Sequence, residues 1–459
     1  MQGTNIELLE RAPVSRAILK LSIPTVLSNI VSLLYNLTDT YFIGLLDDPV
    51  QLGAISLAFP VFMLIQAIGN VFGNGAPSYI SRCLGAKRYD EVKRTSAVSV
   101  YVSSAATIVI GIVIFAFMDP ILHLLGTSEA NIGPTRAYLQ VIVAFAVVII
   151  LQVILSSMLR AAGKVKEAVI GIVIGTVLNI VLDPVFILVF RQGVAGAAIA
   201  TIIGNFVGVV YYVAVYIKGD IPLSIQLKDC RPSVRIFAEV LKIGLPNSVS
   251  VIIMSCSNII LNNLASDFGD HVVSAYGVSG KLIQMVFMIV VGYVTGYMPF
   301  AGYNYGAGNF KRMLSALKFT MLSGTGICLV LLIPFVWLSP NFVGAFTTDG
   351  QIIDVGVRFL RAQAWAVPIM AVQSTMMVTF QATGQAIRAM TVNLGRQLLY
   401  NIPFLFLFSH LWGLNGLLHA QMAADYCTVI TAVLIGIPLL RSLHQKSKQQ
   451  MENLEEETL

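Results

Sequence analysis

The sequence predicts an all-α integral membrane protein with twelve transmembrane helices, in two six-helix lobes related by a pseudo-twofold axis along the membrane normal. Three observations support this prediction. The 459 residues are 56% hydrophobic and only 11% charged, whereas soluble domains carry about 25% charged residues. Apolar runs of about 20 residues, the length of a transmembrane helix, recur along the chain. The two halves of the chain also share a series of short motifs.

The apolar runs define the expected spans. The first 16 residues lack the apolar core of a signal peptide, so the first run is expected to remain as a span. The twelve spans are expected at residues 17–46, 53–80, 95–118, 137–159, 168–190, 194–217, 237–266, 273–302, 314–338, 357–380, 388–411 and 413–440.

Basic residues are distributed unequally between the two sides of the membrane. Most of the 29 Lys and Arg residues fall in the loops of one side, which the positive-inside rule assigns to the cytoplasm. We therefore expect a multi-pass protein of the cell membrane with both termini in the cytoplasm. Because the basic residues lie in short loops, the net charge of +6 reflects orientation and predicts no nucleic-acid partner.

The polar connection at 218–242 separates two similar halves. We expect an N-terminal lobe (1–217), a cytoplasmic linker (218–236), a C-terminal lobe (237–440) and a cytoplasmic tail (441–459). A shift of about 220 residues aligns KLSIPT (20–25) with KIGLPN (242–247), LGAKR (84–88) with YGAGN (305–309), RAAGK (160–164) with QATGQ (381–385), and GVAGAAIA (193–200) with GLNGLLHA (413–420). Six spans per half make the repeats parallel, an arrangement typical of transporters that hold substrate between their halves.

Two aspartates fall inside spans of the first half, at similar depth. Asp39 and Asp183 each lie ~10 Å below the outer surface, as does Thr201. Asn36 and Asn179 share the helix faces of these aspartates. Charged groups inside a membrane are functional candidates, and oxygen ligands suit a hard cation. These five side chains predict a site for a coupling cation, either Na⁺ or H⁺, with a Na⁺ ligand set of Asp39, Asn179, Asp183 and Thr201.

The site has a backbone feature and a structural alternative. Pro184 follows Asp183, and its missing N–H is expected to free a carbonyl near residue 180 or to bend the helix. In the alternative, both aspartates are protonated and only hydrogen-bond neighbouring helices.

The second half lacks these aspartates. Under the same shift, Asp39 falls on Leu261 and Asp183 on Pro403, so the cation site is expected in the first half alone. Lys281 and Asp425 are expected to form a buried ion pair that either organises the lobe or handles substrate. The weaker candidates for a substrate cavity are Lys281, Gln284, Met288, Gln373 and Asp425.

Several motifs together resemble a known family. The first span places Pro24 fifteen residues before Asp39, and the fifth contains N-x-x-x-D-P from Asn179. The segments GNGAPSYISRCLGAKR (73–88) and GYMPFAGYNYGAGNFKR (296–312) follow the second and eighth spans. In this combination, over residues 15–440, the chain resembles the multidrug and toxic compound extrusion (MATE) family.

The resemblance implies two lobes that export small organic cations in exchange for inward Na⁺ or H⁺, without another cofactor. In the bacterial and archaeal type that the chain resembles, the coupling cation lies in the N-terminal lobe, at positions that match Asp39, Asn179, Asp183 and Thr201. Another branch has acidic residues in the first and fourth helices of the C-terminal lobe, where the segments SVIIMSCSNIILNN (250–263) and WAVPIMAVQSTMMVTFQ (365–381) of this chain contain no carboxylate. We expect a protein that works in the lipid bilayer as a monomer.

Two alternatives come from other classes of protein. A lipid-linked saccharide flippase of related fold would be expected to show several cationic groups inside its spans, where only Lys281 is evident. An intramembrane enzyme would be expected to show a motif such as HExxH or GxSxG, and the sequence contains neither. The sequence therefore favours a transporter over an enzyme.

Overall fold

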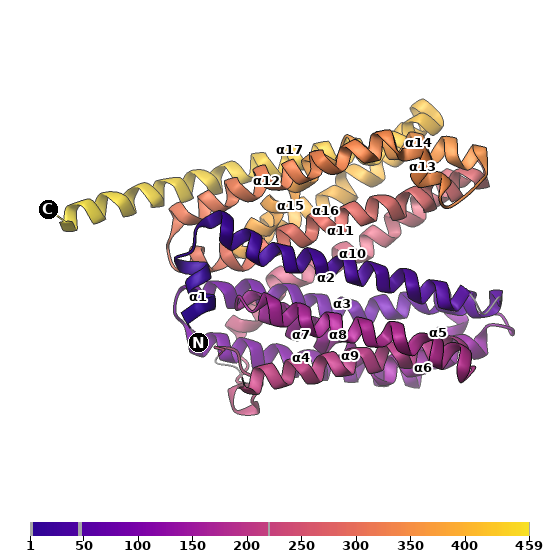
Figure 1. Cartoon of the computed structure of the whole chain (residues 1–459), viewed down its shortest axis with the longest axis horizontal. Coiled ribbons are helices and arrows are strands. Elements are labelled where there is room, and N and C mark those ends of the chain that lie inside the picture. Colours follow the sequence, from indigo (N-terminus) through magenta and orange to yellow (C-terminus); the bar gives the residue numbers. More distant parts are fainter. Residues whose placement is uncertain (1–2, 45–47, 219–220, 459) are drawn as a thin grey trace. The chain divides into compact units, whose positions relative to one another are not determined.

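The computed structural model describes residues 3–44, 48–218 and 221–458, and within these ranges every regular element is a helix (Figure 1). The described chain forms two compact units. Unit 1 comprises Leu27–Leu245 together with the N-terminal residues up to Glu7. Unit 2 comprises Leu8–Val26 and Pro246–Leu459.

The first half contains two irregular spans. α6 and α7 meet at a bend of 50°, and α8 continues into η1, a π-helical stretch. The elements of this half are α1 (Gly3–Glu10), α2 (Val14–Gly44), α3 (Pro49–Gly85), α4 (Tyr89–Ala116), α5 (Met118–Leu124), α6 (Ile132–Ala144), α7 (Ala146–Ala161), α8 (Val165–Pro184), η1 (Val185–Val189) and α9 (Gly193–Lys218).

The second half repeats both irregularities. α14 and α15 meet at 51°, and a second π-helical stretch, η3, joins α16 to α17. After the short η2 (Leu227–Asp229), the elements are α10 (Val234–Ser266), α11 (Asp270–Gly306), α12 (Phe310–Trp337), α13 (Ser339–Gly344), α14 (Gly350–Ala364), α15 (Val367–Ala382), α16 (Ala386–Gly395), η3 (Arg396–Asn401) and α17 (Ile402–Thr458).

The number of membrane-spanning helices agrees with the prediction. Within the described residues, nine helices are long and apolar enough to cross a membrane, or eleven if each bent pair counts as one span. The longest of them, Ala386–Gln450, contains two helices that meet at a kink at Gly413. The prediction of twelve spans is therefore confirmed.

The backbone at the helix ends confirms the internal repeat. Three pairs of residues with positive φ recur at the predicted shift: Lys87 (57°) with Gly308 (74°), Gly163 (78°) with Gly384 (74°), and Gly193 (54°) with Gly413 (56°). A left-handed residue ends a helix sharply, and glycine adopts that conformation without a steric cost. The two halves therefore turn at the same places, and in one of them Lys87 occupies a position that favours glycine.

The boundary between the units falls inside helices α2 and α10. The first part of α10 packs on α3 within unit 1, where a Cβ on Gly75 would overlap the carbonyl of Val240 and a Cβ on Gly244 would overlap the carbonyl of Val71. Only glycine permits such close backbone approach. In unit 2, the first part of α2 packs on α11 in the same manner, and Ser22 Oγ donates a hydrogen bond to the Tyr293 carbonyl at 2.6 Å.

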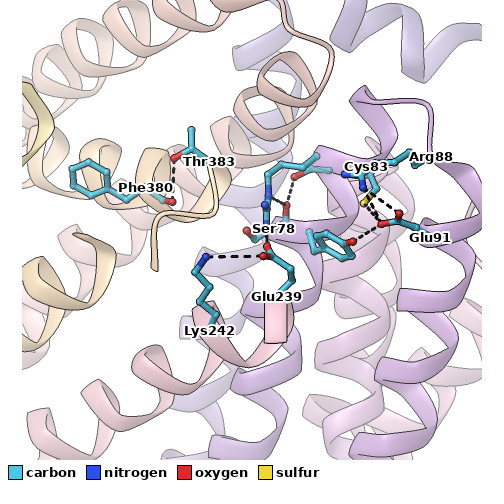
Figure 2. Close-up of polar contacts among 11 residues, drawn as sticks. Ser78, Cys83, Arg88, Glu91, Glu239, Lys242, Phe380 and Thr383 are labelled. Carbon is cyan, nitrogen blue, oxygen red and sulfur yellow. Dashed lines mark hydrogen bonds and ion pairs between the residues drawn. The ribbon is translucent and has the colours of Figure 1, made fainter. Parts of the chain in front are cut away.

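A network of polar side chains holds the start of α10 against α3 and α4 (Figure 2). Arg82 on α3 pairs with Glu239 on α10 at 2.8 Å. Glu91 on α4 pairs with Arg88 at 3.1 Å and with Arg235 on α10 at 3.6 Å. Single ion pairs at a surface contribute little, but this network joins three helices and fixes the chain that leaves the 218–236 connection.

The left-handed residues yield a stability test. Replacing Lys87 with glycine removes the Cβ strain of a left-handed residue, which costs roughly 1–2 kcal/mol, so Lys87→Gly should raise the unfolding temperature in detergent. Gly308→Ala, its counterpart in the second half, should lower it. Thermal unfolding followed by circular dichroism measures both. Equal shifts of the same sign would contradict the shared backbone geometry.

Candidate functional site

Three of the predicted site residues lie in contact in unit 1. The Asn179 amide on α8 donates hydrogen bonds to Asp183 Oδ1 at 3.3 Å and to Thr201 Oγ1 on α9 at 3.2 Å. Asp183 is fully buried and Asn179 is 3% exposed. The prediction that one face of the fifth span carries Asn179 and Asp183 is thus met in the structure, since the two side chains are joined by a hydrogen bond.

Tyr35 completes the cluster and was not predicted. Its hydroxyl lies 3.2 Å from Thr201 Oγ1, which brings α2 into the same polar group as α8 and α9. The sequence holds a signal for it, because Tyr35 precedes Asp39 by four residues and so shares its helix face.

The predicted residues Asn36 and Asp39 belong to α2, but their side chains lie outside the part of the chain that the structure describes. Positions 35 and 39 are one turn apart on that helix. Position 39 therefore lies on the same face of α2 as Tyr35, whose hydroxyl reaches Thr201.

Close helix packing brings Asn179 and Thr201 together. A Cβ on Gly175 of α8 would lie 2.7 Å from the Gly204 carbonyl of α9, so the two backbones can approach only because both residues are glycines. Gly175 and Gly204 lie about one turn from the polar cluster. The distance between α8 and α9 at these glycines sets how far the Asn179 amide must extend to reach Thr201. The cluster is therefore a product of a small-residue interface.

The irregular backbone near Asp183 begins after the proline. α8 remains helical to Pro184, whose missing N–H leaves the carbonyl of residue 180 without its usual helical donor. η1 follows, with the Phe190 N–H donating to the Val185 carbonyl at 2.9 Å. A π-helical turn shifts the register of the side chains that follow it. Asp183 is thus the last buried polar residue of a regular helix.

The prediction of an ion pair between Lys281 and Asp425 is wrong. Asp425, which is fully buried, accepts a 2.6 Å charged hydrogen bond from Arg396 Nε in η3, whereas Lys281 is exposed. The sequence interpretation counted Arg396 among the basic residues of the cytoplasmic side, although it lies within the expected span 388–411, and in the structure it begins η3. The depth of a residue two to three turns from a helix end is uncertain. For this reason the sequence did not identify Arg396 as the partner of Asp425.

A small polar cavity of about 90 Å³ lies beside Arg396 in unit 2. Its polar lining residues are Asn258, Tyr276, Arg396, Gln397, Asn401 and Gln421. Of the predicted cavity residues, Asp425 is linked to it through Arg396, whereas Gln284 is exposed and Met288 and Gln373 are half-buried. Their role in a substrate cavity stays a prediction.

The Arg396–Asp425 pair is expected to be essential for stability. Arg396→Gln leaves a buried carboxylate without its charge partner and should cost about 3–5 kcal/mol, read as a large fall in unfolding temperature. Arg358→Gln, which removes an exposed pair with Asp354 in the same unit, should cost about 0–1 kcal/mol. The Arg396→Met/Asp425→Leu double variant should recover most of the loss. Equal effects of Arg396→Gln and Arg358→Gln would contradict a buried pair.

Comparison with known proteins supplies the family. The MatE family model matches twice, at residues 24–185 and 246–407. The multidrug export protein MepA of Staphylococcus aureus (strain MSSA476) is 32% identical over 96% of this chain and 97% of its own length. MepA of Staphylococcus haemolyticus (strain JCSC1435) is 29% identical over 96% and 98%.

Solved structures agree with these relatives. The outward-facing form of a multidrug resistance MATE family transporter of the MOP superfamily is 26% identical and aligns over 96% of this chain and 99% of that one, with a TM-score of 0.91. A MATE transporter in a bent conformation aligns over 97% and 99%, with 26% identity and a TM-score of 0.90. With one match of the family model in each half and relatives that span nearly its whole length, this chain belongs to the MATE family of membrane transporters.

Proposed function

We propose that this protein is a secondary antiporter that exports amphipathic organic cations across the cell membrane in exchange for Na⁺ or H⁺. The proposal rests on the cluster of Tyr35, Asn179, Asp183 and Thr201 in unit 1, to which the sequence adds Asp39 and Asn36 of α2 as predicted ligands. The relatives named as multidrug export proteins support export over lipid flipping. The distribution of basic residues supports an orientation with both termini in the cytoplasm.

One observation carries the proposal: the fully buried Asp183 carboxylate belongs to a group of oxygen-bearing side chains that hydrogen bonds join. The Nδ2 group of Asn179 donates hydrogen bonds to Asp183 and Thr201. Among the described residues, the Oδ1 atom of Asn179 is buried without a hydrogen-bond partner. A buried acceptor without a partner is costly. A cation coordinated by this oxygen, or the O–H of a protonated carboxyl group, would satisfy it.

The donor set fits a hard cation. Asp183, the Asn179 carbonyl, Thr201 and the Tyr35 hydroxyl supply oxygen atoms only, the ligands that suit alkali and alkaline-earth ions. Asp183 and Asn179 would hold the ion from α8, and Thr201 from α9. The same carboxylate can instead accept a proton, so the donor set is compatible with either coupling ion.

Coupling requires that the cation bind the two conformations of the transporter with different affinity. A negative potential on the inside adds ~2.3 kcal/mol per charge per 100 mV to inward movement of Na⁺ or H⁺. Because the cluster draws side chains from α2, α8 and α9, binding there favours whichever arrangement of these three helices brings their oxygens together. The role of this chain's residues is thus to tie helix arrangement to ion occupancy.

Gradient-driven transport tests the proposal. Asp183→Asn removes the buried charge with little change of shape. Ethidium export from proteoliposomes is measured under an imposed Na⁺ gradient and under an imposed H⁺ gradient. The variant should fail to export under either gradient, including the one that drives the wild type. Asp119→Asn, which alters an exposed acid of unit 1, should export like the wild type. Each gradient is applied alone, so the gradient that drives the wild type identifies the coupling ion.

Two outcomes would refute the coupling assignment. The first is Asp183→Asn protein, folded by its unfolding temperature, that still exports under the gradient. The second is wild-type export that neither gradient drives.

A further inference from the structure

An open groove of about 690 Å³ lies between α12 and α17 in unit 2. The two helices are in contact and run side by side (Figure 1). The lining residues are Leu314, Leu317, Lys318, Met321 and Leu322 from α12, and Leu440, Arg441, His444 and Gln445 from α17. The volume falls within the range of sites for small ligands, ~300–1,000 Å³, and the groove shares no residue with the polar cavity beside Arg396.

The groove combines an apolar wall with a basic rim. Leu314, Leu317, Met321 and Leu322 recur at helical spacing along α12, and Leu322 is 65% exposed. Lys318 projects from the midst of this stripe, and Arg441 faces it from α17. None of the lining residues is acidic.

The basic groups of the rim are available for an external partner. Within the described chain, neither Lys318 nor Arg441 belongs to an ion pair. The neighbouring Lys446 and Lys448 differ, because Lys446 lies over the Phe310 ring and Lys448 pairs with Glu452. The positive charge of Lys318 and Arg441 is therefore not compensated by an ion pair within the described chain.

The depth of the rim matches the level of lipid headgroups. Lys318 lies about two turns from the start of α12 at Phe310, or ~12 Å along its axis. Arg441 follows directly on the last apolar residues of the twelfth span. Long basic side chains at such positions extend their charge to the membrane surface, where basic pockets between helices bind anionic headgroups.

We propose that this groove binds one anionic phospholipid of the surrounding leaflet. Its phosphate contacts Lys318 and Arg441, and one acyl chain lies along the apolar stripe of α12. Charge complementarity and continuity with the membrane identify this occupant. An exported organic cation would be repelled by the rim, and free inorganic phosphate would leave the apolar wall uncovered.

Native mass spectrometry of the full-length protein tests the site. Delipidated protein is titrated with dioleoyl phosphatidylglycerol or with dioleoyl phosphatidylcholine, and the bound lipids are counted. The wild type should retain one phosphatidylglycerol more tightly than any phosphatidylcholine. Lys318→Gln/Arg441→Gln should weaken that lipid by roughly 25-fold, about fivefold for each basic residue removed.

Two controls separate a built site from general attraction. Lys93→Gln/Arg94→Gln removes one lysine and one arginine from exposed positions of α4 and should leave the tight lipid in place. Dihexanoyl phosphatidylglycerol, which has the same headgroup and short chains, should bind far more weakly than the dioleoyl lipid.

Three results would overturn the proposal. Unchanged lipid retention by the Lys318→Gln/Arg441→Gln variant would show that the rim binds no phosphate. An equal loss in the α4 control variant would show that only net charge matters. Equal binding of both chain lengths would show that the apolar wall contributes nothing.

Discussion

The interior of a membrane offers no water to a polar group, so each buried charge must find a partner within the protein or carry a visiting ion. The two units meet this constraint in different ways. In unit 2, Asp425 has a guanidinium partner at 2.6 Å, supplied by the same unit. In unit 1, Asp183 accepts a hydrogen bond from the Asn179 amide, within a group that includes Thr201 and Tyr35. The first arrangement pairs its carboxylate with a guanidinium group of the same unit, whereas we propose that the second holds a cation that comes and goes.

This difference arises on backbones that share several features. Both halves break their fourth span at a bend of about 50°, both place a π-helical stretch in the fifth, and both turn through left-handed residues at matching positions. Backbone features of this kind follow from glycine, proline and helix length, which the repeat retains. The polar residues do not follow the repeat, because Pro403 stands where the first half has Asp183. Duplication thus preserved the scaffold, and the chemistry of each unit was set by a few side chains.

Much of this could be predicted from the sequence. Apolar runs and charge sorting predict the spans, and the four-residue spacing of Asn179 and Asp183 predicts their contact, since both depend on helix geometry alone. Tyr35 and Arg396 were missed for different reasons. Tyr35 is an ordinary residue in an apolar helix until its partner on another helix is known. Arg396 was counted with the basic residues of the cytoplasmic side although it lies within the expected span 388–411, so it was not considered as a partner of Asp425. Contacts between helices distant in sequence, such as α10 on α3, depend on packing that periodicity does not encode.

The central claim is the proposal that the polar cluster around Asp183 in unit 1 holds the coupling cation, and cation binding without substrate tests it most directly. Uptake of Na⁺ and of protons is measured in parallel on purified wild-type protein and on the Asp39→Asn/Asp183→Asn variant. The account predicts that the wild type takes up one cation, Na⁺ or H⁺, that the folded variant does not. Equal uptake of both ions by the two proteins would contradict it.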